Sequence, residues 1–292
     1  MYTTRRHFTR LARLPLAAAS LALLGLAWTP PAAFAADLLA GVKDKKEMVV
    51  GTEAQFAPFE FVQDGKIVGY GPDLMSLIMA DMPSVKVKQL DLPFQGILPG
   101  LAAKRFDFVI TSVSMTRERA DKFAFTLPIA DATVSLVKRK VDASIAKPED
   151  VNGKVVGSQA GSAQMKALQD FDARQKAAGK AGIKELREYT SFDEAYADLA
   201  VGRLDAVAQS LSSLATLTKT RGDVYTVVAG PIGPKTYFGW VGRKDADSAP
   251  LVKFFNDGIA KAAKSGKLKE LQMKWFGFTM DTPIDALPTP TM

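Results

Sequence analysis

The residues that could perform chemistry in this chain are few in kind. The sequence contains one histidine, His7, and no cysteine, which excludes disulfides, thiol nucleophiles and thiolate metal sites. His7 lies near the N-terminus, so a mature chain that lost this end would contain no imidazole. Ser–His and Cys–His catalysis and histidine metal sites would then be excluded as well. Carboxylates are plentiful, and an acid–base pair of carboxylates stays open.

Short motifs of the common phosphate-binding and hydrolytic sites are absent from the sequence. It contains no Gly-x-x-x-x-Gly-Lys loop and no Gly-x-Ser-x-Gly turn. Gly69 and Gly71 begin a dinucleotide-binding pattern that lacks its third glycine, and we interpret them as part of a turn. Ser144 and Lys147 match Ser-x-x-Lys, but Pro148 follows where that motif needs a continuing helix. We interpret this match as chance.

The N-terminus has the layout of an export signal. Residues 14–28 form an apolar stretch, shorter than the ~20 residues that a membrane span needs. Residues 33–35 fit a small-x-small cleavage pattern, so cleavage is expected between Ala35 and Ala36. Residues 1–35 are therefore predicted to be a signal peptide and the protein to be periplasmic. The basic region that precedes the apolar stretch consists of Arg5, Arg6, Arg10 and Arg13, of which the first two also resemble a twin-arginine signal.

This segment carries much of the positive charge of the chain. The formal net charge is +7, and loss of the four arginines lowers it to about +3. Basic and acidic residues are interspersed through the remainder, which is typical of solvated surfaces rather than of a nucleic-acid interface. We expect no nucleic-acid partner.

Segments typical of strands and of helices alternate along the mature chain, which predicts an α/β fold. Ser162 is suited to cap one helix, and residues 191–194 form a capping box for the next. Strands are expected at 48–52, 85–90, 106–111, 133–139, 154–157, 205–209, 225–228 and 236–242. Helices are expected at 72–82, 94–104, 162–178, 191–202, 250–265 and 268–276.

Two stretches could connect separate structural units. Residues 142–152 are polar, and residues 230–234 are rich in glycine and proline; they lie about 90 residues apart. This spacing suits a second domain inserted into the first, with the chain crossing over and returning.

Four ordered patterns resemble the polar amino-acid family of periplasmic solute-binding proteins of ABC transporters. They are VGTEAQFAPFEF at 50–61 with GYGPDL at 69–74, FQGILPGL at 94–101 with FDF at 106–108, SVSMTRER at 112–119 with FAFT at 123–126, and GKVVG at 153–157 with GS at 161–162 and GRLDAV at 202–207. Each is weak alone, but the ordered set covers nearly the whole mature chain.

The resemblance implies a two-lobed periplasmic-binding-protein fold of type II. Each lobe would hold a mixed, mostly parallel sheet flanked by helices, and two crossover strands would form the hinge. The first lobe would comprise residues 36–131 and 237–292, and the second, inserted lobe would comprise residues 132–236.

The resemblance also implies a ligand site. Arg119 matches the carboxylate-binding arginine of the family, whose planar guanidinium can donate two parallel charge-assisted hydrogen bonds. Ser114 matches a residue that helps to hold the same carboxylate, and Ser112 lies just upstream of it. Phe56 and Phe94 match aromatic residues that pack against the ligand side chain, although ordinary core packing is the alternative for both.

Ser162 and Ala163 would hold the carboxylate from the other lobe. They lie at the start of an expected helix, where backbone N–H groups favour an anion.

One position departs from the family pattern. The family usually has an acidic residue directly after the segment 205–209, where it holds the α-ammonium of the substrate, and this chain has Ser210 there. A buried ammonium without a carboxylate partner costs roughly several kcal/mol. Three explanations stay open. Glu53, which matches an acidic ligand-contacting position, takes over this role, or the ligand lacks a free ammonium, or the site has changed function. Glu60 is a further candidate acid.

The implied function is a receptor that captures a small carboxylate-bearing solute, an amino acid or a derivative, by lobe closure and delivers it to a membrane permease. We expect a monomer without metal or cofactor. The alternative is an enzyme on the same scaffold, of the cyclohexadienyl dehydratase type. There Arg119 would bind a carboxylate, and Glu53 or another acid would transfer a proton.

Overall fold

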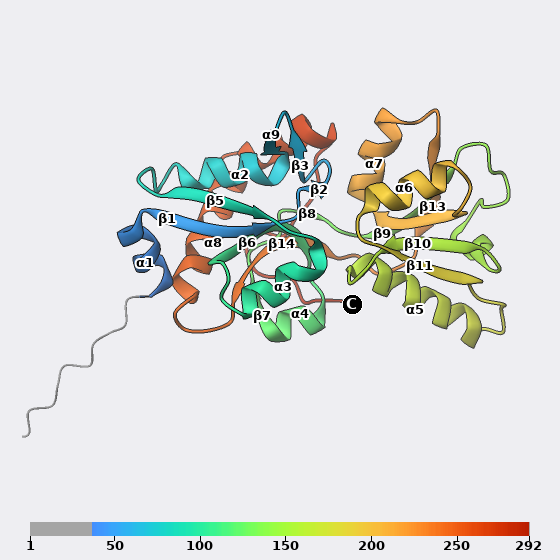
Figure 1. Cartoon of the computed structure of the whole chain (residues 1–292), viewed down its shortest axis with the longest axis horizontal. Helices are drawn as coiled ribbons and strands as arrows, with labels where there is room; N and C mark the ends of the chain where they lie inside the picture. The colour runs from blue at the N-terminus through green and yellow to red at the C-terminus, as the bar shows by residue number, and fades with distance from the viewer. Residues whose placement is uncertain (1–36, 292) are drawn as a thin grey trace, which may run out of the picture. The chain divides into compact units, whose positions relative to one another are not determined.

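Two large β-sheets covered by helices, and one small sheet, make up residues 37–291, the part of the chain that the computed structural model describes (Figure 1). The predicted signal peptide and its cleavage site lie outside the described residues. Within residues 37–291, no helix has the length and the apolar character needed to cross a membrane.

The first sheet, with the helices around it, forms the lobe that we call the first lobe. Its strands are β1 (Glu47–Thr52), β5 (Lys86–Asp91), β6 (Phe108–Ser114), β7 (Phe123–Phe125), β8 (Ala130–Asp131) and β14 (Tyr237–Arg243). The order is β5-β1-β6-β14-β7, with β8 paired to β14. β1 is parallel to β5 and β6, whereas β14 is antiparallel to β6, β7 and β8.

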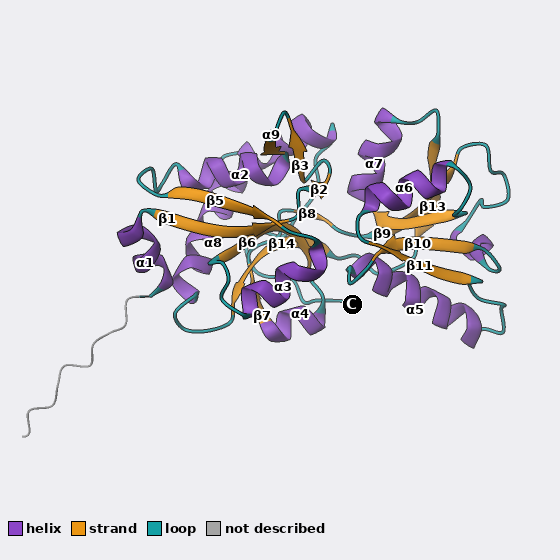
Figure 2. Cartoon of the chain, viewed as in Figure 1, coloured by secondary structure: helices purple, strands orange, loops and turns teal. Residues whose placement is uncertain are grey.

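Helices cover both faces of this sheet, as Figure 2 shows. They are α1 (Leu38–Lys45), α2 (Tyr70–Met79), α3 (Phe94–Ala102), α4 (Arg117–Lys122), α8 (Ala249–Lys264) and α9 (Lys267–Phe276). In α8, apolar residues recur every three or four positions and bury one face of the helix. Phe255 on that face stacks on Phe108 of β6 with ring centroids 4.5 Å apart, which fixes the helix against the sheet.

A small antiparallel sheet consists of β2 (Gln55–Phe56), β3 (Glu60–Gln63) and β4 (Lys66–Val68).

The second sheet belongs to the second lobe and is built from residues 134–231. Its strands are β9 (Val134–Arg139), β10 (Val155–Gln159), β11 (Glu185–Tyr189), β12 (Ala206–Ser210) and β13 (Tyr225–Pro231). The order is β11-β10-β12-β9-β13, in which β10 is parallel to β11 and β12 and β9 is antiparallel to β12 and β13. Its helices are α5 (Ala163–Ala177), α6 (Phe192–Ala200), α7 (Leu211–Thr220) and the 3₁₀ turn η1 (Pro148–Val151).

The two-lobed α/β fold with mixed sheets is thus confirmed, with one difference. Parallel pairs do not predominate, because β9 and β14, the strands that follow the two crossings between the sheets, run antiparallel to their neighbours.

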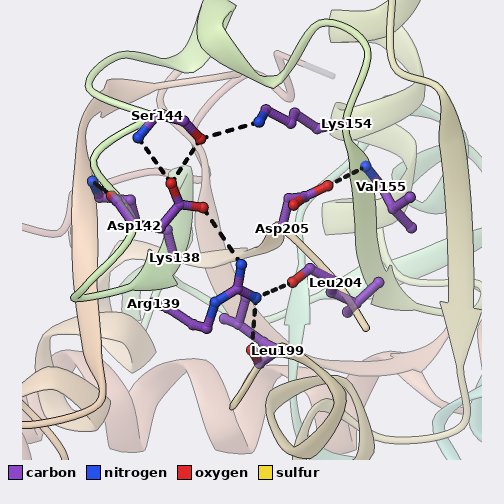
Figure 3. Close-up of polar contacts among 9 residues, drawn as sticks. All are labelled: Lys138, Arg139, Asp142, Ser144, Lys154, Val155, Leu199, Leu204 and Asp205. Carbon is purple, nitrogen blue, oxygen red and sulfur yellow. Dashed lines mark hydrogen bonds and ion pairs between the residues drawn. The ribbon is translucent and has the colours of Figure 1, made fainter. Parts of the chain in front are cut away.

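The two sheets share one hydrogen-bond arrangement at an aspartate. Asp107 accepts a hydrogen bond from the Val49 amide at 2.8 Å, and Asp205 accepts one from the Val155 amide at 2.8 Å (Figure 3).

All of the expected elements are present, and their ends differ from the expected ones by at most three residues. Ser162 caps α5 by accepting a hydrogen bond from the Met165 amide, and Ser191 caps α6 through the Glu194 amide. The expectation missed the strands β2, β3, β4, β7, β8 and β11, and also the helices α1, α4 and α7. The missed strands are two to five residues long and α4 has six residues, too few to display a period.

Candidate functional site

A small cavity lies where the strands of the two lobes end. Glu53 follows β1, Ser112 and Ser114 lie at the end of β6, and Gln159 ends β10. The carboxyl ends of neighbouring parallel strands meet at one edge of a sheet, which is where ligands bind in open α/β sheets. The nine residues that line the cavity are Glu53, Phe56, Phe94, Ser112, Ser114 and Arg119 from the first lobe and Gln159, Ser162 and Gln164 from the second.

Seven of the nine residues predicted from the sequence therefore lie together, and Ala163 and Ser210 are not among the lining residues. The cavity has a volume of about 10 Å³, roughly the room of one water molecule. A solute of amino-acid size can enter only if the lobes or the lining side chains move apart.

Arg119 is held in place from both lobes. Thr116 caps the short helix α4 by accepting a hydrogen bond from the Arg119 amide. The guanidinium donates to the Ser114 carbonyl of the first lobe at 3.2 Å and to the Gly161 carbonyl of the second lobe at 3.1 Å. It also lies over the Phe94 ring, 5.2 Å from the centroid. Burial lowers the pKa of Arg119 to about 10, so the group stays cationic at neutral pH, and its partners are neutral carbonyls.

The two predicted aromatic residues differ in their surroundings. Phe94 is the first residue of α3, which follows Pro93, and it contacts the guanidinium of Arg119. Phe56 stacks against Phe59 of its own lobe at 5.2 Å and against Phe192 of the second lobe at 5.6 Å. Both rings line the cavity, and Phe56 is at the same time part of the hydrophobic core.

Glu60 is completely buried behind the cavity and organises the end of β6. It accepts hydrogen bonds from the Thr111 hydroxyl at 3.1 Å and from both the amide and the hydroxyl of Ser112 at 3.2 Å. Burial, supported by the charge of Glu53, raises the pKa of Glu60 to about 8 against the opposing hydrogen bonds. The Ser112 hydroxyl is therefore directed at Glu60, although Ser112 also lines the cavity.

Glu53 is the second charged residue of the cavity lining and is 3% exposed. The amide group of Gln159, in the other lobe, donates to it. Burial, together with the charges of Asp91 and Asp193, raises the pKa of Glu53 to about 7 against the opposing hydrogen bond from Gln159. Glu53 also lines a neighbouring cavity of about 100 Å³ together with Asp91, so this end of the site is acidic.

The second-lobe wall consists of neutral polar groups. Ser162 donates to the Gln159 carbonyl at 2.7 Å and caps α5. Gln164 donates to the side-chain oxygen of Gln209 at 3.0 Å. Sequence reasoning missed Gln159 and Gln164. Their positions, at the end of β10 and in the first turn of α5, are the signal that could have identified them.

Ser210 lies behind that wall. It is fully buried; its amide donates to Gln209 at 2.7 Å, and its hydroxyl exchanges hydrogen bonds with Ser212 and Ser213. The position at which the family usually has an acid is thus part of a hydroxyl and amide network.

A larger groove adjoins the cavity. It has a volume of about 610 Å³ and runs between α3, α4 and α5, with apolar lining from residues such as Leu98 and Met165. Phe94, Arg119 and Ser162 line both spaces, and Ala163 lines the groove.

The Ser-x-x-Lys match is not an active pair. Ser144 donates to Asp142 at 2.6 Å and accepts from Lys154 at 3.1 Å, so Lys147 is not its partner (Figure 3). Among residues 37–291, no cluster of histidine, aspartate and glutamate side chains could hold a metal ion.

Comparison with known proteins shows which proteins this chain is similar to. The family model "Bacterial extracellular solute-binding proteins, family 3" matches residues 48–278. The "L-cystine-binding protein TcyJ" of Escherichia coli K12 is 31% identical over 82% of this chain and 86% of its own length.

Two solved structures are similar as well. A mutant of ArgBP from T. maritima has a TM-score of 0.73 at 30% identity, covering 82% of this chain and 99% of that one. "The ancestral amino acid-binding protein AncCDT-1, a precursor of cyclohexadienyl dehydratase", has a TM-score of 0.72 at 26% identity, with coverage of 82% and 99%. The match over most of its length means that this chain belongs to family 3 of the bacterial extracellular solute-binding proteins.

Proposed function

We propose that this protein is the periplasmic receptor of an ABC importer and that it captures a small carboxylate-bearing solute. The observation that carries the proposal is Arg119, a half-buried cation whose hydrogen-bond partners are the carbonyls of Ser114 and Gly161 rather than an acid. A carboxylate in the adjoining cavity would supply the missing negative charge through charge-assisted hydrogen bonds.

Capture would proceed by closure of the lobes. Six of the nine lining residues belong to the first lobe, so an entering solute would meet Arg119, Glu53 and the two phenylalanines there first. Closure then adds Gln159, Ser162 and Gln164, and a ligand favours the closed form because only that form provides contacts from both sides.

Relatives support the remaining parts of the proposal. The names of the similar proteins describe cystine-binding and arginine-binding receptors, which favours an amino acid or a derivative as the solute. A related protein is called an amino-acid ABC transporter-binding protein, which supports a membrane permease as partner. We propose residues 1–35 as the export signal, 36–131 with 237–292 as the first lobe, 132–236 as the second, and a monomer as the working form.

The test is a comparison of Arg119→Ala, Arg119→Lys and Arg117→Ala by calorimetry. The solute is first identified by native mass spectrometry of the mature protein purified without unfolding, and a panel of amino acids and organic acids serves as the alternative source of probes. Two hydrogen bonds between charged groups contribute about 3–6 kcal/mol. Arg119→Ala should therefore weaken binding by about a hundredfold or more.

The lysine variant retains the charge but not the planar pair of donors, so it should recover only part of this loss. Arg117 is an exposed neighbour on the same helix, and its alanine variant should bind normally. Equal affinity of Arg119→Ala and the unmodified protein would refute the assigned site.

A dehydratase is the second candidate, favoured by one observation. Glu53 has a pKa of about 7, which suits proton transfer at neutral pH, and it lines the same cavity as Arg119. Turnover of prephenate or arogenate, followed by absorbance and abolished in Glu53→Gln, would support the enzyme. Binding without turnover would support the receptor.

A further inference from the structure

The two charged groups of the cavity have different partners across the lobes. Arg119 is bonded across the lobes to the carbonyl of Gly161, whereas Glu53 is bonded across the lobes to the side chain of Gln159. Glu53 also lines the neighbouring cavity that contains Asp91, and Arg119 also lines the larger groove. The site therefore has a cationic end and an acidic end.

The acidic end is suited to a cation. Glu53 is almost fully buried, and its hydrogen-bond donor is the neutral amide of Gln159. Asp91 and Asp193 lie close enough to affect its ionisation, and the residues that line the neighbouring cavity include no lysine or arginine. A cationic group in this region would offset the unfavourable burial of the Glu53 carboxylate.

The cationic end, in contrast, does not suit a second positive charge. The nitrogen of an α-amino acid is two bonds away from its carboxylate carbon, so a carboxylate on Arg119 brings its α-ammonium close to the guanidinium. The second-lobe residues that line the cavity are neutral. Behind them, Ser210 is committed to Gln209, Ser212 and Ser213, and it offers no negative charge.

We propose that the site selects an ω-cationic carboxylate without a free α-ammonium: the carboxylate binds Arg119, the remote cation binds Glu53, and the connecting chain packs against Phe56 and Phe94. This inference rests on the proposed receptor function and specifies its solute class. Glu53 is the one acid among the nine residues that line the cavity. Once Glu53 holds the remote cation, an α-ammonium would lie beside Arg119 without an acid of its own, which is a strongly unfavourable environment. Neutral groups at the α-carbon would meet the amide of Gln164 and the hydroxyl of Ser162 instead.

Matched probes test the two halves of this inference on the mature protein by calorimetry. L-Arginine and 5-guanidinopentanoate differ only in the α-ammonium, and 5-ureidopentanoate replaces the guanidinium by a neutral group of the same shape. We expect 5-guanidinopentanoate to bind at least about tenfold more tightly than either of the other two. Agmatine, which retains the cation but has no carboxylate, should bind no more tightly than L-arginine.

Variants at Ser210 and Glu53 test which residues cause these differences in affinity among the probes. Ser210→Asp should strengthen binding of L-arginine by about tenfold relative to 5-guanidinopentanoate, whereas Ser210→Asn, which matches it in size, should not. Glu53→Gln should remove the preference for the guanidino over the ureido probe. Circular dichroism spectra and melting temperatures verify that each variant folds, and the probe comparison on the unmodified protein needs no variant at all.

The outcomes separate this inference from the receptor function. L-Arginine binding as tightly as 5-guanidinopentanoate, or more tightly, overturns the solute class and leaves the receptor function intact. Failure of 5-guanidinopentanoate to bind at about millimolar concentration overturns it as well. Binding of 5-guanidinopentanoate that survives Arg119→Ala overturns the carboxylate site itself, and with it the proposed function.

Discussion

Replacement of Glu60 by glutamine should flatten the pH dependence of stability. Glu60 is fully buried and accepts hydrogen bonds from Thr111 and Ser112. Burial raises its pKa from the ordinary value of 4.5 to about 8. At neutral pH the folded protein therefore holds this carboxyl group mainly in its protonated form, which glutamine mimics in shape and in charge.

The magnitude follows from the difference between the two pKa values. Between pH 4.5 and about 8, the unfolded chain releases this proton and the folded protein retains it. The unfolded state then binds fewer protons, so the free energy of unfolding falls as the pH rises. Each pH unit costs about 1.4 kcal/mol, which gives an upper limit of about 5 kcal/mol over the whole interval. The glutamine variant cannot titrate and should lose this slope.

The assay is urea unfolding at pH 5, 7 and 9, followed by the fluorescence of Trp240 and Trp275. Glu53, whose pKa is raised to about 7, adds a similar pH dependence of the free energy of unfolding to the unmodified protein and to the Glu60→Gln variant. Subtracting one profile from the other therefore cancels the contribution of Glu53. Glu118→Gln, at a glutamate whose side chain is 81% exposed, is the control and should follow the unmodified protein. Parallel profiles for Glu60→Gln and the unmodified protein would refute the reasoning.

Two further pairs of variants test the packing and the helix caps around the site. A Cβ on Gly71 would lie 2.2 Å from Glu60 Oε1, so Gly71→Ala should lower the free energy of unfolding by about 1–3 kcal/mol. Gly96→Ala, with nothing within 4 Å of the added atom, should not be destabilising in the same urea experiment. Ser162→Ala and Ser191→Ala each remove a helix cap and should each cost about 1 kcal/mol. Calorimetry should show weakened solute binding for Ser162→Ala alone, and equal binding by both variants would contradict the role of Ser162 in the site.

Local patterns accounted for much of the fold. The caps Ser162 and Ser191 were correctly identified because a cap depends on residues within one helical turn. Helices α5 and α8 were expected for a similar reason, since their apolar spacing is visible in the chain itself. Helix α7 was missed, although Ser210 precedes it, because its polar and β-branched residues give little local signal for a helix.

The site depended on relationships that no local pattern contains. Gln164 lies in the cavity because α5 begins where β10 ends. Gln159 reaches Glu53, 106 residues earlier in the chain, because the two strand ends face each other across the lobes. The hydroxyl of Ser112 is bonded to Glu60, 52 residues away, a partner that spacing along the sequence does not indicate.

The sequence by itself determined the absence of thiols, the confinement of the single imidazole to the N-terminus, the alternating elements, and the arginine and glutamate that could hold a solute. These follow from composition and from interactions within a few residues. Only the tertiary structure decided that Arg119 and Glu53 line one cavity and that Ser210 is not among its lining residues. The physical reason is that parallel strands bring together chain segments that are about 40 to 60 residues apart, and side-chain burial and charge pairing are set there.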